Sequence, residues 1–267
     1  MPQIDLQDVT LNYTLTGTSP GASNASVLMF SNSLGTNLTM WEPQLEFLEP
    51  HYRILRYDMR GHGLSSVPPG PYTVTQLGND VIDLLNALNI KRVHFCGLSI
   101  GGIIGQWLGI NAASRLNKLI LCNTAAKIGT TETWNKRIAE VTNDGISSIA
   151  DGVVQRWFTP GFPADHASVV SRMKQMLLAT NPAGYLASCA ALRDNDLRGA
   201  ISAIHTPVCV IAGNQDPVTT VADAQFIKDR IPGAQLTVLP AAHISNAEVP
   251  ELFSTTVLDF IAKDVHQ

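Results

Sequence analysis

The stretch Phe95–Gly102, "FCGLSIGG", places Ser99 between Gly97 and Gly101 at the end of an apolar run. Gly-x-Ser-x-Gly is the motif of a nucleophile elbow, a tight strand-to-helix turn that exposes a serine hydroxyl above a sheet. Such a turn needs glycines because it is strained and because a Cβ would collide with neighbouring backbone. Serine and glycine are also common in ordinary turns. The motif therefore indicates an active site only if the rest of the chain supplies partners for Ser99.

Short apolar runs recur along the chain and are typical of strands buried on both faces. Each is rich in branched and aromatic residues and is nearly continuous in its apolarity. The runs are ASVLMFSNS (25–33), YRILRYDM (52–59), RVHFCGLS (92–99), NKLILCNT (117–124), TPVCVIAGNQD (206–216) and QLTVLP (235–240). The opening segment 4–17 alternates more clearly, which predicts a leading antiparallel hairpin or edge pair.

Helical patterns separate these runs. Segment 73–89 places apolar residues on one stripe, segment 219–233 opens with threonine caps, and segment 248–265 spaces its apolar residues for burial. Alternation of strands and helices predicts an α/β fold with a mostly parallel central sheet and helices on both faces.

The alternation breaks between residues 129 and 198, where every pattern has a helical period. A helical insertion between two late strands is expected to lie over the carboxyl end of the sheet, where ligands bind in open α/β folds. We therefore predict a core formed by residues 1–128 and 199–267, and a helical cap formed by residues 129–198.

Bulk composition narrows the class of protein. The 267 residues are 45% hydrophobic and 15% charged, enough apolar material for a large buried core. A net charge of −4 argues against a nucleic-acid partner or a polybasic membrane surface. The first residues lack the features of a signal peptide, and no apolar run is long enough to span a membrane. The four cysteines lack metal-ligand spacing, which favours buried, reduced thiols in a cytoplasmic protein. The sequence leaves the oligomeric state open.

A base and an orienting acid are needed to activate Ser99, because a serine hydroxyl alone is a poor nucleophile. Asp216 ends one buried run, and His243 follows the next. The order Ser99, Asp216, His243 is the order used by the fold in which the elbow occurs. The other histidines fit structural roles better, for example His62 in the glycine-rich turn RGHGLS. The end of run 117–124 offers Asn123 and no acid, so Asp216 takes the acid role by elimination as well as by position.

An oxyanion hole is the remaining requirement. One donor is expected to be the backbone N–H of Ile100, directly after Ser99. The other is expected to be the backbone N–H of Leu34, in the loop SNSLGT (31–36) that follows the first buried run. Two such donors stabilise the charge that develops on a carbonyl oxygen, and the loss of one typically costs about 10²–10³ in rate.

Taken in order, the segments SNSLGT, YDMRGHGLS, CGLSIGG, CNTA, AGNQDPVT and AAHISNAE resemble the α/β-hydrolase superfamily across nearly the whole chain. The chain is similar, more narrowly, to the 3-oxoadipate enol-lactonase family. That narrower resemblance depends on SNSLGT, where many hydrolases carry His-Gly. It also depends on LCNTAAKIG (121–129), which leads into a cap that contains Trp134 and the run RWF (156–158).

The resemblance implies a reaction and a substrate class. The family hydrolyses a five-membered enol-lactone to 3-oxoadipate in bacterial catabolism of protocatechuate and catechol. Ser99 would attack the lactone carbonyl, His243 would take its proton, and Asp216 would stabilise the imidazolium. Neither a metal nor an organic cofactor is required.

The small-molecule lactone carries a free carboxylate, so its pocket should offer a cation. Arg137 and Arg156 of the cap are the best candidates, with Lys136 and Lys127 behind them, because the guanidinium fork suits a carboxylate. The alternative is that these basic residues simply face water.

Three further residues are open to two interpretations. Trp134 and Trp157 either line an apolar slot beside the sheet or hold the cap down by packing. Glu248 either assists His243 or caps the final helix, and capping is the expected role.

Rival functions share much of this pattern. A general carboxylesterase, a perhydrolase-like enzyme or a carbon–carbon bond hydrolase would use the same three residues, and a non-catalytic binding protein could retain the pocket. Ser99 argues against epoxide hydrolases and haloalkane dehalogenases, which use an aspartate nucleophile.

Overall fold

The strands of the computed structural model, which describes residues 2–17 and 26–262, form one sheet. In these residues the sheet has eight strands in the order β1-β2-β4-β3-β5-β6-β7-β8. The strands are β1 Gln3–Asp5, β2 Thr10–Thr16, β3 Val27–Ser31, β4 Arg53–Tyr57, β5 Val93–Leu98, β6 Leu116–Cys122, β7 Val208–Gly213 and β8 Gln235–Leu239. The strands from β4 to β8 in this order pair parallel with one another, whereas β2 pairs antiparallel with both β1 and β4. Each predicted strand is therefore confirmed, as is the leading antiparallel pair.

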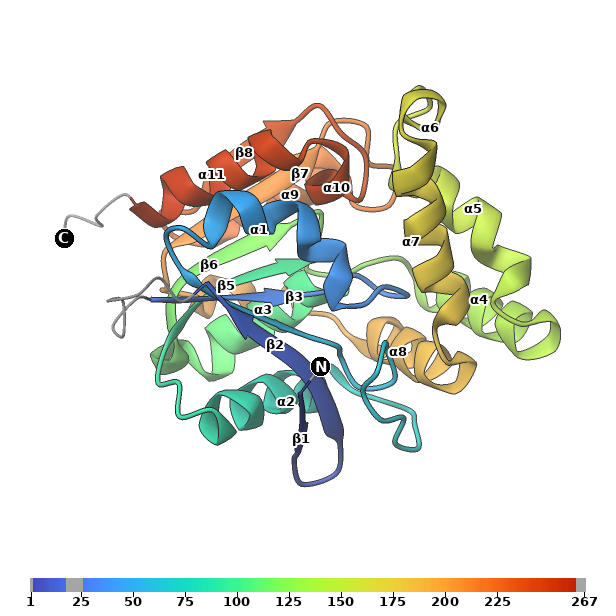
Figure 1. Cartoon of the computed structure of the whole chain (residues 1–267), viewed down its shortest axis with the longest axis horizontal. Coiled ribbons are helices and arrows are strands. Elements are labelled where there is room, and N and C mark those ends of the chain that lie inside the picture. Colours follow the sequence, from blue (N-terminus) through green and yellow to red (C-terminus); the bar gives the residue numbers. More distant parts are fainter. Residues whose placement is uncertain (1, 18–25, 263–267) are drawn as a thin grey trace.

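Helices cover both faces of the sheet, as predicted (Figure 1). Helices α1 (Glu42–Leu48) and α11 (Pro250–Ala262) lie on one face. Helices α2 (Val74–Ala87), α3 (Ile100–Asn111) and α9 (Val221–Arg230) lie on the other. The predicted threonine start of α9 is confirmed, because Thr220 and Asp223 form a reciprocal capping box.

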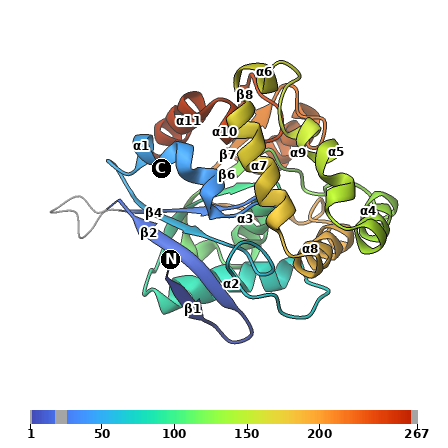
Figure 2. The same ribbon diagram turned by 45° about the vertical axis from the view of Figure 1, so that its right-hand side comes forward.

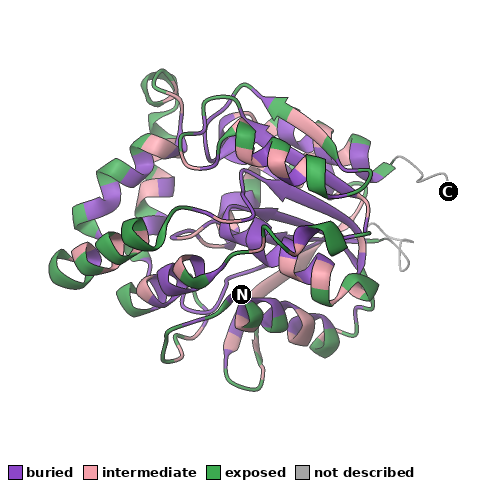
Figure 3. Cartoon of the chain, turned by 180° about the vertical axis from the view of Figure 1, so that it is seen from behind, coloured by how far each residue is buried: buried purple, intermediate pink, exposed green. Residues whose placement is uncertain are grey.

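Burial on both faces explains why the strand sequences are continuously apolar. Successive side chains of a strand point to opposite faces. Met29 accordingly packs in the cluster beneath α2 and α3, and its neighbour Phe30 packs against Trp41 in the cluster beneath α1 and α11. Figure 3 shows the central strands buried between helices whose outer faces are exposed.

The segment between β6 and β7 is helical, as its periodicity predicts. It contains α4 (Thr131–Asp144), α5 (Ser147–Trp157), α6 (Phe162–Asp165), α7 (Ala167–Ala179) and α8 (Pro182–Asp194). Figures 1 and 2 show these five helices gathered at one end of the sheet. The division into a core and a separate cap domain stays a prediction; the term cap is used here for α4–α8.

Close backbone approach seats the last cap helix on the core. A Cβ on Gly184 of α8 would lie 2.2 Å from the carbonyl oxygen of Gly61, so only glycine allows this contact. One turn further on, the backbone N–H of Tyr72 donates to the carbonyl of Ala187 at 3.2 Å. Helix α8 is therefore held against the loop that follows β4.

The four cysteines are all buried, as expected. The sulfurs of Cys96 and Cys122 lie 3.6 Å apart, well beyond the length of a disulfide bond. In the described part of the chain, no helix combines the length and the apolar character that crossing a membrane requires.

Candidate active site

Ser99 lies at a sharp turn between the end of β5 and the start of α3. Its φ of 59° and ψ of −115° are strained for a residue with a side chain. A Cβ on Gly97 would lie 2.1 Å from the carbonyl oxygen of Gly101, and a Cβ on Gly101 would lie 2.3 Å from that of Ser31. The glycines on both sides of Ser99 are therefore required by the crossing of backbone segments, and the turn has the form of a nucleophile elbow.

The neighbouring strand β6 holds this turn in place. The backbone N–H of Ser99 donates to the carbonyl of Cys122 at 3.0 Å. The hydroxyl of Thr124 donates to the carbonyl of Ser99 at 2.7 Å. The strained conformation is thus stabilised by hydrogen bonds from outside the turn itself.

Asp216 and His243 meet at the ends of β7 and β8. The Oδ2 atom of Asp216 lies 2.8 Å from Nδ1 of His243, and both residues are buried. Asp216 also accepts hydrogen bonds from the backbone N–H groups of Val218 and Thr219 and from the Thr219 hydroxyl. Burial by itself would raise the pKa of this carboxyl, but the charge and hydrogen bond of His243, the backbone N–H of Thr219 and the side-chain amide of Asn123 outweigh it and lower the pKa to about 2. Asp216 is therefore an anion beside the imidazole at neutral pH.

Asn123 joins the same network from the end of β6. Its φ is positive at 42°, and its Nδ2 donates to Asp216 Oδ2 at 3.1 Å and to the carbonyl of Ala242 at 3.0 Å. The hydroxyl of Ser245 donates to Asn123 Oδ1 at 2.6 Å. In the sequence, Asn123 is notable only because it stands where an acid is absent. In the structure it contacts Asp216 and residues on both sides of His243 in the chain.

The loop after β3 brings Leu34 to the same place. Ser33, Leu34, Ser99 and His243 all line one cavity, and Ile100 follows Ser99 as the first residue of α3. The side chain of Asn32 anchors the base of the loop, donating to the carbonyl of Tyr57 at 2.8 Å and accepting from the indole N–H of Trp41 at 2.9 Å.

His62 supports this loop from below, in the structural role that its position predicts. Its Nε2 accepts a hydrogen bond from the backbone N–H of Gly35 at 3.1 Å, and its Nδ1 lies 3.2 Å from the carbonyl of Arg60. Burial lowers the pKa of His62 to about 4, partly opposed by the Arg60 carbonyl. The imidazole is therefore neutral near pH 7, as acceptance from Gly35 requires.

The cavity that contains Ser99 has a volume of about 310 Å³ and lies between the sheet and the cap. Its lining includes no carboxylate among the described residues. Trp134 and Trp157 both line it, and both also pack against the hydrophobic core. The indole N–H of Trp134 donates to the carbonyl of Ile128 at 2.6 Å. The two interpretations of the tryptophans are thus compatible: they shape the cavity and pack the cap.

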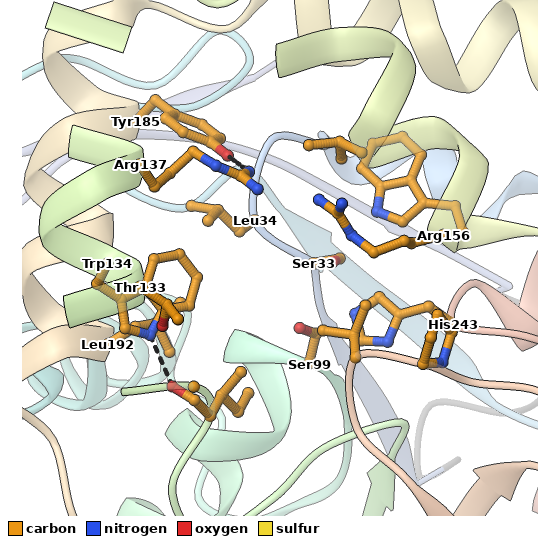
Figure 4. Close-up of a pocket in the computed structure, with 16 residues that line it drawn as sticks. Ser33, Leu34, Ser99, Thr133, Trp134, Arg137, Arg156, Tyr185, Leu192 and His243 are labelled. Carbon is orange, nitrogen blue, oxygen red and sulfur yellow. Dashed lines mark hydrogen bonds between the residues drawn. The ribbon is translucent and has the colours of Figure 1, made fainter. Parts of the chain in front are cut away.

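Arg137 of α4 and Arg156 of α5 enter this cavity from two sides. Figure 4 shows their guanidinium groups pointing toward one another above Ser99. Arg137 Nη1 donates to the hydroxyl of Tyr185 at 3.1 Å. Burial and then the positive charge of Arg137 lower the pKa of Arg156. In the described ranges, no carboxylate lies within ion-pair distance of either arginine, and the charge of Glu140 only partly opposes the lowering of the Arg156 pKa. The cavity therefore presents two cations that contact no protein carboxylate.

The other basic candidates lie elsewhere. Lys127 is 3.5 Å from a carboxylate oxygen of Asp196, and Lys136 is exposed on α4; neither lines the cavity. Tyr185, which the sequence did not single out, is a further lining residue and a partner of Arg137. No local pattern in α8 distinguishes it from a packing tyrosine.

Glu248 does not cap the final helix, so that expectation is wrong. Its Oε1 accepts hydrogen bonds from the backbone N–H of Thr159 at 2.8 Å and from the Thr159 hydroxyl at 2.5 Å. Its Oε2 accepts from the backbone N–H of Ala242 at 2.7 Å. Both carboxylate oxygens therefore accept hydrogen bonds, one from Thr159 of the cap segment and the other from the residue before His243.

Known proteins resemble this chain in sequence and in structure. Residues 26–250 match the family described as the alpha/beta hydrolase fold. Two proteins from Acinetobacter baylyi, 3-oxoadipate enol-lactonase 2 and 3-oxoadipate enol-lactonase 1, are 47% and 41% identical to this chain. The first alignment covers 94% of this chain and 92% of the relative, and the second covers 90% of each. The crystal structure of the enol-lactonase from Burkholderia xenovorans has a TM-score of 0.95 and 40% identity, over 98% of this chain and 100% of that one.

Proposed function

Because this chain belongs to the α/β-hydrolase family, we propose that it is a serine hydrolase acting on a lactone, and specifically a 3-oxoadipate enol-lactonase. The observation that carries the proposal is the pair Arg137 and Arg156, which face the same cavity as Ser99 and contact no carboxylate among the described residues. An ester with a free carboxylate matches this arrangement, and the two relatives named above bear the name of an enzyme for such a substrate.

Nucleophilic attack is assigned to Ser99. His243 takes the hydroxyl proton as general base, and Asp216 holds the imidazole by its Nδ1 and stabilises the imidazolium that forms. The low pKa of Asp216 supports this role, because the acid must stay ionised while the histidine changes charge. The strained elbow keeps the serine at the cavity wall rather than in the helix.

Stabilisation of the oxyanion of the tetrahedral intermediate is assigned to the backbone N–H groups of Leu34 and Ile100. Opening of the ring expels an enolate, which is a better leaving group than an ordinary alkoxide. The enolate takes the proton held by the His243 imidazolium and becomes a ketone, which leaves His243 neutral again. Water, activated by His243, then releases the acyl group from Ser99. Apart from water, the proposed steps use only side chains and backbone donors of this chain.

The substrate carboxylate is assigned to Arg137 and Arg156. Two guanidinium groups that face each other repel, so an anion between them relieves that repulsion and gains charge-assisted hydrogen bonds. Tyr185 limits the movement of Arg137 through its hydroxyl. Trp134 and Trp157 supply the apolar walls beside the ring. The proposal includes the expected cytoplasmic location and a place in the bacterial degradation of protocatechuate and catechol.

Loss of the ultraviolet absorbance of the enol-lactone tests the assignment. The parent protein and its Ser99→Ala variant are assayed side by side with the lactone. Rapid loss with the parent and none with the variant would support both the reaction and the nucleophile. If the parent does not hydrolyse the lactone but cleaves neutral aryl esters, the protein is a serine esterase and the enol-lactonase assignment is wrong.

A further inference from the structure

The carboxylate of Glu248 connects the segment after α5 with the segment before His243. The proposed reaction depends on the relative position of these two segments. One oxygen is shared by the backbone N–H and the hydroxyl of Thr159, just after the end of α5. The other accepts from the backbone N–H of Ala242, the residue directly before His243. Glu248 is 9% exposed, so these bonds form with little competition from water.

A second contact joins the same two segments. The backbone N–H of Ile244 donates to the carbonyl of Trp157 at 2.9 Å. His243 is therefore flanked by two residues, Ala242 and Ile244, that are each connected to the end of α5, one through Glu248 and one directly. The contacts around Glu248, Thr159 and Ala242 are called the Glu248 bridge below.

The cap side of the bridge carries residues of the cavity. Arg156 and Trp157 lie three and two residues before Thr159 in the chain, and both line the cavity that contains Ser99. A shift of the end of α5 would therefore move the proposed carboxylate site, and the bridge would pass that shift to the loop of His243. Catalytic geometry is sensitive to such shifts, because a displacement of about 1 Å can cost about 10² in rate.

We propose that Glu248 is a positioning residue: it fixes the end of α5 and the loop of His243 relative to one another. This inference rests on the proposed function for the role of His243, but not on the identity of the lactone. A glutamate at this point is needed because both of its oxygens must accept: the backbone N–H groups of Thr159 and Ala242, one at each oxygen, can only donate. An amide in its place would direct an NH₂ group at one of those donors.

Two isosteric changes test the proposal. Glu248→Gln replaces one acceptor by a donor, and Thr159→Val removes the hydroxyl while keeping the shape of the side chain. Thr159→Ser keeps the hydroxyl. Glu251→Gln is the matched control, because Glu251 is exposed on the first turn of α11. Each variant is measured for kcat and KM with the enol-lactone and for the rate at which a fluorophosphonate labels Ser99.

Fluorophosphonate labelling needs Ser99 and His243 but neither arginine of the cap, so it reads the histidine side of the bridge alone. We expect Glu248→Gln to lower the labelling rate and kcat by at least about tenfold and to raise KM. Thr159→Val should lower the labelling rate by at least about threefold, and Thr159→Ser and Glu251→Gln should stay within about twofold of the parent.

A folded Glu248→Gln variant with a parental labelling rate would overturn the proposal, even if its KM changed, because Glu248 would then seat the cap only. If Glu248→Gln does not fold, the comparison of Thr159→Val with Thr159→Ser decides, and equal labelling rates in those two variants overturn it. A parent that is labelled on Ser99 but does not hydrolyse the enol-lactone would end the proposed function and still leave this inference to be decided by labelling.

Discussion

Asp216 Oδ2 lies 2.8 Å from Nδ1 of His243, although 27 residues separate them in the chain. The two residues meet because β7 and β8 are parallel neighbours whose carboxyl ends reach the same edge of the sheet. Ser99 stands at the end of β5, two strands away from β7 in the order β5-β6-β7-β8. The proposed catalytic residues are thus carried by strand ends, and their substrate-facing partners by the cap.

Replacement of Asp216 by asparagine is expected to lower kcat by about 10³–10⁴. The asparagine amide would present an N–H group to Nδ1 of His243, which favours the tautomer with the proton on Nε2. That tautomer cannot accept the proton of Ser99. Steady-state kinetics of Asp216→Asn, with the exposed Asp229→Asn as control, checks this. Unchanged kcat in Asp216→Asn would remove the acid from the mechanism.

Substitution of either cavity arginine should affect carboxylate substrates selectively. Arg137→Gln and Arg156→Gln are each expected to lower kcat/KM for the enol-lactone by about 10–100-fold, because each removes charge-assisted hydrogen bonds to the carboxylate. Hydrolysis of a neutral aryl ester should change less than about threefold. Arg172→Gln is the control, since Arg172 lies on α7 and pairs with Glu42 at 3.0 Å. Equal losses on both substrates would show that the arginines act through packing.

Replacement by alanine should change the unfolding free energy in opposite directions at two glycines, Gly101 and Gly152. Gly101→Ala forces a Cβ to within 2.3 Å of the Ser31 carbonyl oxygen and is expected to cost at least about 3 kcal/mol of unfolding free energy. Gly152→Ala, on the exposed side of α5, meets no atom closer than 3.9 Å and is expected to add up to about 1 kcal/mol. Denaturant unfolding measures both. A neutral Gly101→Ala would contradict the close crossing at the elbow.

The protonation of His62 should contribute to acid sensitivity. Its pKa is 6.5 when exposed and about 4 in the fold, where burial disfavours the charged ring. Between these values the unfolded chain binds more protons than the native protein, so stability falls as the pH is lowered. From pH 7.5 to pH 5 this loss is about 2 kcal/mol.

Replacement of His62 by glutamine isolates that contribution. The His62→Gln variant should lose about 2 kcal/mol less stability than the parent between pH 7.5 and pH 5, because it lacks the titrating ring. The measurement is denaturant unfolding of both proteins at the two pH values. If the unfolding free energies of the two proteins change equally with pH, His62 is not held neutral beneath the loop that contains Gly35.

Strand ends explain why so much of the site could be predicted from the sequence. A parallel strand buried on both faces is a continuous apolar run, and its carboxyl end is marked by the first polar residue after it. Ser99 and His243 are the first polar residues after β5 and β8, and Asp216 lies three residues after the end of β7. The period of segment 129–198 predicts helices, and its place between two strands predicts a position over the carboxyl ends of the sheet.

Contacts that depend on the seating of the cap could not be predicted. Tyr185 faces Arg137 because α8 approaches the core through Gly184, and no local pattern in α8 records that direction. The sequence position of Glu248 favours capping of the nearest helix because capping is a local interaction, whereas Glu248 binds Ala242 and also Thr159, which is 89 residues away. Side-chain bonds between the cap and the core arise from packing and have no periodic signature.

The most direct test compares the enol-lactone as the free acid with its methyl ester. The two compounds share the reacting ring and differ only in the carboxylate that Arg137 and Arg156 are proposed to bind. The account predicts that kcat/KM for the free acid exceeds that for the methyl ester by at least about 30-fold, and that Ser99→Ala hydrolyses neither. Equal values for the two compounds, or a preference for the methyl ester, would contradict a lactonase built around the substrate carboxylate.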